Sequence, residues 1–235
     1  MREPDFRFKK FAVWQDCSAM KVGTDSVLLG AWAQLEGRNR ILDIGTGTGL
    51  LALMAAQRNS TAHITAVEID RLAAGQAQEN VRLSDWSNRI TVICGDARQF
   101  EDELGFDAII CNPPYFTRSL HSPDMARNAA RHNDTLSFTE LSGAISRLLT
   151  ADGEASLVLP TDAVADFTGA AALTGLQIHR VTDICTKTGK PPKRTLISIG
   201  KSFCEPCCTR LSIIGEDGAE TREYINLVSD FYLKY

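Results

Sequence analysis

The sequence feature that most constrains the fold is a glycine-rich turn between a buried strand and a helix. Residues 40–45 form a short apolar strand, and the run Asp43-Ile-Gly-Thr-Gly-Thr-Gly49 leads into a helix rich in Leu and Ala at 50–57. Glycines in such a turn permit positive φ and let a ligand approach the backbone closely. The strand, turn and helix therefore predict a ligand site at the carboxyl end of a strand in a parallel sheet.

Downstream of this turn, strand-like and helix-like segments alternate along the chain. Apolar strands that alternate with helices indicate a parallel sheet wound by right-handed crossovers. Three extended segments near the end of the chain lack a long helix between them and are expected to form an antiparallel sheet edge. We expect parallel strands also at 63–69, 89–94, 106–111 and 154–160, edge segments at 176–186, 195–202 and 211–214, and helices at 26–32, 71–83, 136–149, 162–173 and 223–231.

The predicted fold class is α/β and Rossmann-like, with a seven-stranded, mostly parallel sheet that has an antiparallel edge. A chain of 235 residues is long enough to bury one full core, so we expect a single domain over residues 1–235. Within this domain, residues 1–34 are expected to form an N-terminal cap and residues 35–235 the core.

Charge and hydropathy exclude several classes of protein. The net charge of −4 and the pI of about 5.6 argue against a strong, non-specific nucleic-acid binder, although local basic patches can still bind. The sequence has no run of eighteen or more apolar residues, so we expect no membrane span. Its first residues contain no apolar signal segment, and we expect a cytoplasmic location.

The seven cysteines, in a chain without an export signal, are expected to be reduced thiols. Three of them form the cluster Cys204-x-x-Cys207-Cys208. A structural zinc site needs a second pair of Cys or His ligands at defined spacing, and none follows this cluster. We therefore expect no bound metal.

The spacing of the glycine-rich turn favours one class of cofactor. The nicotinamide fingerprint is G-x-G-x-x-G, whereas Gly45, Gly47 and Gly49 form G-x-G-x-G and Leu50 stands at the sixth position. Asp43 would repel a pyrophosphate, but it can pair with an ammonium group. S-adenosylmethionine carries an ammonium group and no phosphate, so we predict that Asp43, Gly45 and Gly47 bind this cofactor.

Acidic residues also follow the next two strands. Glu68 stands at the tip of the second strand, where a carboxylate roughly twenty residues after the turn reaches ribose hydroxyls in this architecture. Asp70 is expected to cap the next helix instead. After the third strand, Asp96 and Ala97 are candidates for contact with the adenine of the cofactor.

The most specific motif is Asn112-Pro113-Pro114-Tyr115, at the end of the fourth strand. Ligands of open α/β sheets bind outside the carboxyl ends of strands, so Asn112 is expected to point into the site. An adenine N6 is a poor nucleophile, because its lone pair is delocalised, and it carries two N–H donors. The Asn112 oxygen and the Pro113 carbonyl can accept both, the prolines fix the backbone, and Tyr115 can stack on the base. These four residues therefore predict methylation of a planar amino nitrogen, with adenine in RNA favoured.

Basic side chains gather in three parts of the chain: the stretch 116–135 that follows the motif, the segment 187–194 and the N-terminal residues 7–10. Arginines can hold phosphates, and a long polar loop over an active site is often functional. For each segment taken alone, a solvated surface is the alternative interpretation. The candidates for contact with nucleic acid are Arg118, Arg131, Lys190, Lys193 and Arg194, and the N-terminal patch consists of Arg7, Lys9 and Lys10 between Phe6, Phe8 and Phe11.

Taken together, these motifs resemble those of the class I methyltransferases. Residues 43–49 are similar to their first motif, Glu68 to their ribose-binding acid, and 112–115 to their amino-methylating motif. The leader narrows the resemblance: Asp16-Cys-Ser-Ala-Met-Lys-Val-Gly-Thr-Asp-Ser-Val-Leu-Leu-Gly-Ala-Trp32 closely resembles the start of the bacterial valine-tRNA adenine-37 N6-methyltransferase family. The likeness continues at 50–54, 77–80 and 231–233.

The resemblance implies N6-methylation of the adenosine beside the anticodon of a valine tRNA. The methyl donor would be S-adenosylmethionine and the product S-adenosylhomocysteine, with tRNA as the partner and no obligate protein partner. The resemblance also places Lys21 near the methionine end of the cofactor, with Thr24 as a candidate for its carboxylate. Asn112 would contact both the cofactor and the target base.

Other functions remain open on the sequence alone. Enzymes that methylate a glutamine nitrogen of release factors share the amino-methylating motif. Enzymes that methylate an amino group of guanine in ribosomal RNA are a second alternative, but they tend to carry Phe at the fourth motif position, so Tyr115 disfavours them. A non-catalytic RNA-binding module with this fold and a nicotinamide reductase are alternatives from other classes. The G-x-G-x-G spacing disfavours the reductase, and an intact cofactor site disfavours the module.

Overall fold

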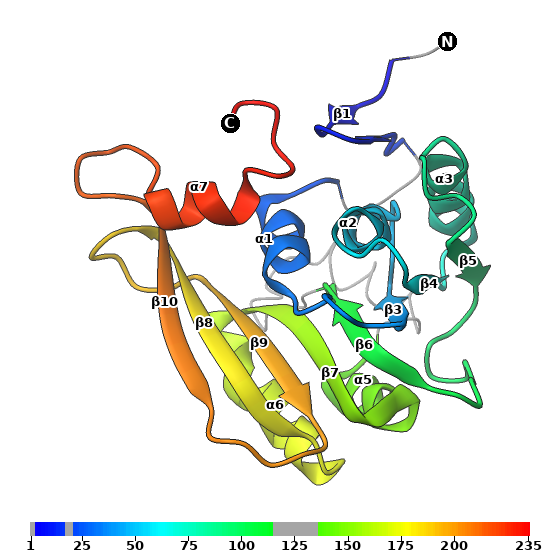
Figure 1. Ribbon diagram of the computed structural model, residues 1–235. Coiled ribbons are helices and arrows are strands. Elements are labelled where there is room, and N and C mark those ends of the chain that lie inside the picture. Colours follow the sequence, from blue (N-terminus) through cyan, green and yellow to red (C-terminus); the bar gives the residue numbers. More distant parts are fainter. Residues whose placement is uncertain (1–2, 17–20, 115–135) are drawn as a thin grey trace, which may run out of the picture.

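The computed structural model describes residues 3–16, 21–114 and 136–235, and an eight-stranded sheet forms its centre (Figure 1). The strand order is β10-β8-β9-β7-β6-β3-β4-β5. Strands β3 to β7 are parallel, while β9 is antiparallel to both β7 and β8. The strands are β3 (Arg40–Ile44), β4 (His63–Glu68), β5 (Ile90–Cys94), β6 (Phe106–Cys111), β7 (Leu149–Pro160), β8 (Gln177–Lys187), β9 (Arg194–Gly200) and β10 (Cys207–Ile214).

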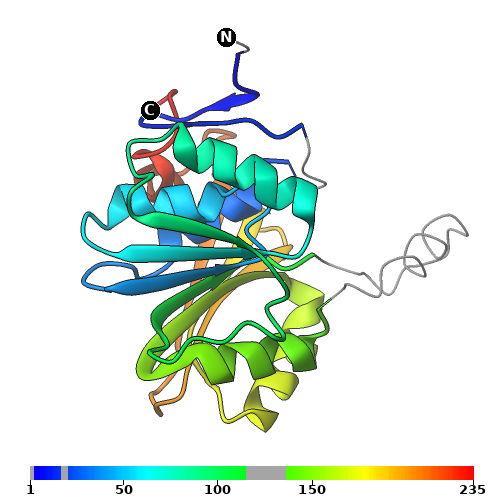
Figure 2. The same cartoon turned by 90° about the vertical axis from the view of Figure 1, so that its right-hand side faces the viewer.

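Helices cover both faces of this sheet (Figures 1 and 2). One face carries α1 (Thr24–Trp32), α2 (Leu50–Arg58), α3 (Arg71–Arg82) and α7 (Arg222–Val228), and the other carries α5 (Phe138–Leu148) and α6 (Val164–Leu173), which the short 3-10 helix η1 (Thr161–Ala163) precedes. Strands between two helix layers are apolar on both sides. In β3, Ile41 packs in the core under α1 and α2, and Leu42 packs in the core under α5.

Two of the helices begin at residues whose side chains cap them. Asp70 precedes α3 and accepts a hydrogen bond from the Ala73 N–H at 2.8 Å, so the predicted helix cap is confirmed. Ser137 and Glu140 form a capping box at the start of α5. Among the helices of the described ranges, none has the length and apolar character that a bilayer span requires.

The mostly parallel, Rossmann-like sheet is confirmed, but two details of the prediction are wrong. The sheet has eight strands rather than seven, because all eight extended segments that can be read from the sequence join it. The last of them, β10, pairs in parallel with β8 and is not antiparallel to its neighbour. The connection 201–206 reverses the chain direction after β9, so β10 runs opposite to β9 and in the same direction as β8. Because β10 pairs with the free side of β8, it forms the outer strand of the sheet.

A separate two-stranded hairpin precedes the sheet. Its strands are β1 (Phe6–Arg7) and β2 (Ala12–Val13), which pair antiparallel. In Figure 2 this hairpin lies above α3, and the carboxyl ends of the parallel strands point to the right. The residues that follow these strand ends therefore share one edge of the sheet.

Candidate active site

The candidate site lies where the strand order changes direction. From β3 the chain first adds β4 and β5 on one side and later adds β6 on the other, so the ends of β3 and β6 flank a topological switch point. Ile44 pairs with Cys111 of β6 and with Val67 of β4, and Glu68 pairs with Cys94 of β5. Ligands of open α/β sheets bind in the crevice at such a point.

The glycine-rich turn adopts a backbone conformation that favours glycine. Gly45, Gly47 and Gly49 have φ values of 69°, 56° and 82°. The Gly45 N–H donates to the Val67 carbonyl at 2.8 Å, which holds the turn against the end of β4. A Cβ added at Gly45 would meet nothing within 4 Å, so the space beside this backbone is open.

Asp43 lies at the end of β3 beneath this turn and is 0% exposed. Its Oδ2 accepts hydrogen bonds from the Thr46 hydroxyl at 2.5 Å and the Ala52 N–H at 3.1 Å. Its Oδ1 is buried and has no hydrogen-bond partner among the described residues. Burial raises the pKa of Asp43 from 3.8 to about 7. An ammonium group, or a water that it holds, would supply the missing donor, so the residue fits an aminoacyl ligand.

Glu68 connects the end of β4 to the turn. Its Oε2 accepts the Gly47 N–H at 2.8 Å, and its Oε1 accepts the Asp70 N–H at 3.0 Å. Each carboxylate oxygen has a second lone pair for a ribose hydroxyl. The sequence placed Glu68 at the strand tip, but it did not reveal that the same side chain holds Gly47.

Asp96 lies after β5 and is paired with Arg98, a residue that the sequence analysis missed. The Arg98 guanidinium reaches both Asp96 oxygens, with an Nη2–Oδ2 distance of 2.7 Å. This hydrogen bond lowers the pKa of Asp96. Arg98 also lies 3.4 Å from Glu140 of the α5 capping box. The adjacent Ala97 is 8% exposed.

Asn112 follows β6 and is 8% exposed. Its Nδ2 donates to the Ser26 hydroxyl at 2.8 Å. Ser26 lies in the first turn of α1 and is 86 positions away in the chain, so no local pattern pointed to it. Pro113 is buried and Pro114 is exposed. The predicted residues Tyr115, Arg118 and Arg131 lie outside the described residues.

The start of α1 brings the leader to the same edge. Lys21 and Thr24 are exposed there. Asp25 pairs with Arg194 at 2.6 Å. Thr24 and Asp25 therefore lie in the same helical turn as Ser26, which contacts Asn112.

The basic segment 187–194 forms the turn between β8 and β9. Arg194 pairs in register with Pro160, the last residue of β7, so this turn lies at the same edge as Asn112. Lys190 and Lys193 are exposed, whereas Arg194 is partly buried and bound to Asp25. Lys190 and Lys193 therefore face solvent, whereas Arg194 forms an ion pair with α1.

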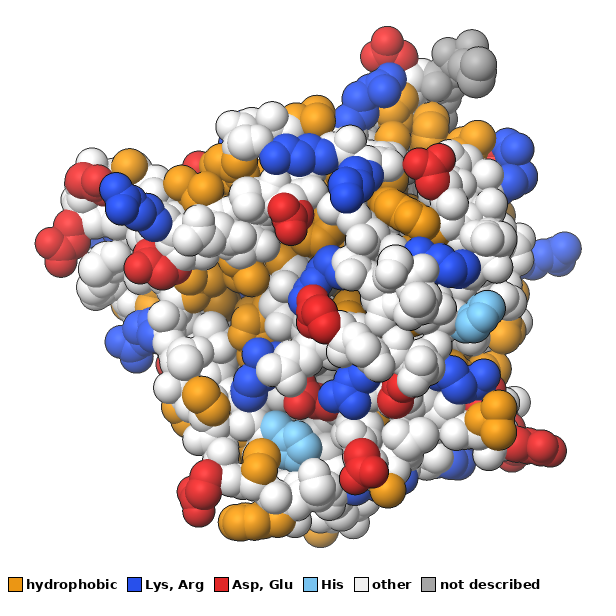
Figure 3. Space-filling model, in the orientation of Figure 1, with side chains coloured by type: hydrophobic (Ala, Val, Ile, Leu, Met, Phe, Trp, Pro, Cys, Tyr) orange, Lys and Arg blue, Asp and Glu red, His pale blue; other side chains and the backbone are white. Residues whose placement is uncertain are grey.

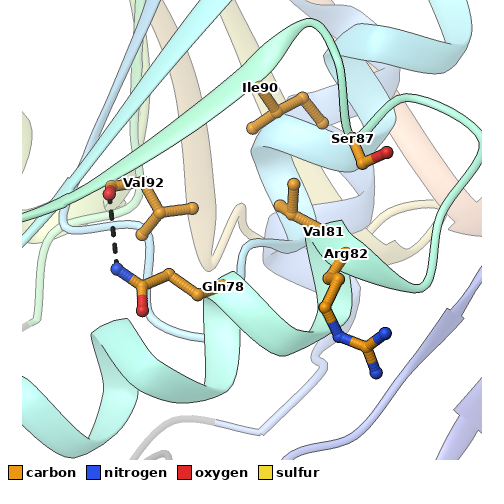
Figure 4. Close-up of a pocket in the computed structure, with 6 residues that line it drawn as sticks. All are labelled: Gln78, Val81, Arg82, Ser87, Ile90 and Val92. Atoms are coloured by element: carbon orange, nitrogen blue, oxygen red, sulfur yellow. Dashed lines mark hydrogen bonds between the residues drawn. The ribbon is translucent and has the colours of Figure 1, made fainter.

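Two further features lie away from this site. Cys204 is partly exposed, and Cys207 and Cys208 are exposed free thiols at the start of β10. Within the described ranges, no group of His, Cys, Asp or Glu side chains is arranged to hold a metal ion. A shallow hollow between α3 and β5 contains none of the predicted residues (Figure 4); it is lined by Gln78, Val81, Arg82, Ser87, Ile90 and Val92.

Comparisons with known proteins agree with this geometry. The methyltransferase small domain family matches residues 18–135. The chain is 50% identical over 239 residues to the tRNA1(Val) (adenine(37)-N6)-methyltransferase of Bacteroides fragilis, with both chains covered completely. It is 43% identical to the protein of the same name from Tolumonas auensis, with 97% of each chain covered. A predicted O-methyltransferase from Agrobacterium tumefaciens shares the fold, with a TM-score of 0.67 at 22% identity, over 88% of this chain and 96% of that one.

Proposed function

This chain belongs to the family of tRNA1(Val) (adenine(37)-N6)-methyltransferases, and we propose that it methylates N6 of adenosine 37 in a valine tRNA. The observation that carries this proposal is the position of Asn112 at the switch point, beside the glycine-rich turn and held by Ser26. A side-chain amide held at the carboxyl end of a strand can accept a hydrogen bond from a base. The neighbouring glycine-rich turn leaves room for a methyl donor.

Asn112 and Pro113 act on the target amino group. The Asn112 Oδ1 and the Pro113 carbonyl accept the two N6 hydrogens and thereby direct the nitrogen lone pair out of conjugation. No strong base has to act first, because the nitrogen proton becomes acidic once the methyl group is attached. Most of the rate then comes from holding the reacting atoms close and in line. Tyr115 is proposed to stack on the base.

Asp43, Glu68 and Asp96 hold the cofactor in this proposal. S-adenosylmethionine, when bound, supplies an activated methyl group on a sulfonium and leaves as S-adenosylhomocysteine. Asp43 takes the ammonium end, Glu68 the ribose and Asp96, with Ala97, the adenine. Lys21 and Thr24 lie at the methionine end. The reaction needs no metal, because the sulfonium is already an activated donor.

The RNA side of the proposal rests on charge. Lys190 and Lys193 project from the β8–β9 turn at the same edge as Asn112, where they can contact phosphates. Arg118 and Arg131 belong to the stretch proposed to contact the tRNA near the target base. The whole chain then acts as one methyltransferase domain in the cytoplasm, where its tRNA is found, without an obligate protein partner.

The proposal is tested by incubating the protein with labelled S-adenosylmethionine and total tRNA from a strain that lacks the enzyme. Digestion should release labelled N6-methyladenosine, and the label should map to a valine tRNA. An Asn112→Ala variant should bind the same tRNA but transfer label at least about 100-fold more slowly. Label in a release factor or in ribosomal RNA instead would overturn the tRNA substrate, and no transfer to any of them would favour a binding module.

A further inference from the structure

The N-terminal hairpin, residues 6–13, is a second basic segment of the described chain, besides 187–194. It contains three cations, Arg7, Lys9 and Lys10, and no acidic residue, in a protein whose net charge is −4. All three side chains are exposed. In the described ranges no carboxylate forms an ion pair with any of them. In Figure 3, Lys and Arg side chains lie beside hydrophobic ones around this hairpin, at the top of the molecule.

The aromatic residues between these cations anchor the hairpin. Phe8 and Phe11 are 4% and 8% exposed and stack at a centroid distance of 4.6 Å. Phe8 also stacks on Tyr232 near the end of the chain, and the Lys9 N–H donates to the Phe231 carbonyl at 2.9 Å. Because the aromatic side of the hairpin is buried against the C-terminal residues, its basic side is fixed toward solvent.

A buried amide links the hairpin to the cofactor turn. Asn80 of α3 is 1% exposed. Its Nδ2 donates to the carbonyls of Trp14 and Thr48, each at 2.8 Å, and its Oδ1 accepts the Trp14 N–H at 3.0 Å. Trp14 directly follows β2, and Thr48 belongs to the glycine-rich turn. The hairpin therefore keeps a fixed position relative to the glycine-rich turn, and in Figure 2 it lies above α3.

We propose that Arg7, Lys9 and Lys10 form a docking surface for phosphates of the tRNA substrate, at nucleotides other than the target adenosine. This inference rests on the proposed function and extends it. The β8–β9 turn and the N-terminal hairpin then contact the RNA on two sides of the site. Unpaired cations on a rigid support gain affinity for phosphates by releasing counterions, without ordering a loop and without breaking an existing ion pair.

The test compares two triple variants that lower the net charge equally. R7A/K9A/K10A removes the hairpin cations, and K201A/R210A/R222A removes three exposed cations around β10 and α7. We expect the hairpin variant to raise the KM for tRNA about tenfold with little change in kcat. The slope of log(kcat/KM) against log[salt] should become shallower by about two, since single-stranded contacts contribute about 0.7 each. The control variant should stay within about twofold of the unmodified protein.

Two further measurements separate the possible failures. The first is cofactor affinity, measured by calorimetry, which should be unchanged in the hairpin variant. Asn80 ties the hairpin to the glycine-rich turn, so a hairpin that had misfolded would also weaken cofactor binding. A K9R/K10R variant should retain the KM for tRNA. If the hairpin variant matches the unmodified protein in KM and salt slope, the docking surface is wrong while the proposed function stands. If the unmodified protein methylates no tRNA, the proposed function is wrong. The docking surface is then tested by tRNA binding alone: weaker binding by the hairpin variant than by the control variant supports it, and equal binding overturns it.

Discussion

At the glycine-rich turn, Asp43 and Glu68, which are proposed to hold the cofactor, are buried and already hydrogen-bonded, whereas Lys190 and Lys193, which are proposed to contact RNA, are exposed. Asp43 and Glu68 are 0% and 9% exposed, and each accepts backbone N–H groups within the fold. Lys190 and Lys193 have no such burial. We call Asp43 and Glu68 the cofactor side, where binding is proposed to depend on fixed geometry and desolvation. We call Lys190 and Lys193 the RNA side, where binding is proposed to depend on long-range charge.

Substitutions in these two groups of residues should therefore have different effects on activity. A substitution on the cofactor side changes an enclosed hydrogen-bond network, so its effect should be large, local and insensitive to salt. A substitution on the RNA side removes one of several screened charges, so its effect should be small, additive and dependent on salt. Asn112 stands at the boundary, because it is buried and is proposed to contact the base.

The largest effect is expected at this boundary. Asn112→Ala should lower kcat by a factor of about 100 to 1,000, the typical cost of losing one hydrogen-bonding group that acts on the reacting centre. The Kd for tRNA should change little, because the phosphate contacts remain. Single-turnover rates with valine tRNA and filter-binding assays measure the two quantities.

Ser26→Ala is the matched variant for this experiment. It removes the hydrogen bond to Asn112 Nδ2 but keeps the amide, so kcat should fall by only a few-fold. If Ser26→Ala is as damaging as Asn112→Ala, Asn112 matters through its position in the fold rather than through contact with the base.

Asp43→Asn sharpens the comparison on the cofactor side. Asp43 has a raised pKa of about 7, so the buried carboxyl favours its neutral form, while an ammonium ligand requires the ionised form. Cofactor affinity of the unmodified protein should therefore rise about tenfold between pH 6 and pH 8, as the ionised fraction rises. The variant should bind at least about tenfold more weakly at pH 8, with little dependence on pH. Calorimetry at both pH values measures this.

The same variant should have the opposite effect on the unliganded fold. A carboxyl whose pKa is raised on folding contributes stability below its ordinary pKa of 3.8, and this contribution is lost as pH rises toward about 7. Asp43→Asn should remove that loss, so the difference in thermal midpoint between variant and unmodified protein should grow in favour of the variant from pH 4 to pH 8. An equal difference at every pH would mean that Asp43 is ionised throughout.

The β8–β9 turn provides a smaller effect that depends on salt. Lys190→Ala with Lys193→Ala should raise the KM for tRNA by about three- to fivefold and make the salt slope shallower by about one. Arg194→Ala removes the same kind of charge but also breaks the 2.6 Å pair with Asp25, so it should lower kcat through α1 and Ser26. If Arg194→Ala changes KM and salt slope only, the ion pair does not position α1.

The sequence predicted the residues whose roles follow from position in a strand or turn. Glu68 at the tip of β4 and Asp70 as a helix cap were both found from local pattern and both lie where they were placed. Ser26 and the parallel direction of β10 were missed, because each depends on elements that meet only in three dimensions. Arg98 was missed for a different reason: it is two residues from Asp96, but nothing local showed that its guanidinium would occupy that carboxylate.

Arg98 therefore gives the smallest and most diagnostic prediction. Its guanidinium holds both Asp96 oxygens and also reaches Glu140 at the start of α5, and its side chain is 28% exposed. Solvent screens a pair of this exposure, so Arg98→Ala should raise the KM for S-adenosylmethionine by only about threefold and leave kcat and the salt slope for tRNA unchanged. Arg82→Ala is the control, since it breaks a comparable 2.6 Å pair with Glu79 on α3, away from the strand ends. A KM shift in Arg98→Ala but not in Arg82→Ala would place Arg98 among the positioning residues of the cofactor side, and equal behaviour of the two variants would mean that Asp96 does not need its arginine to contact the adenine.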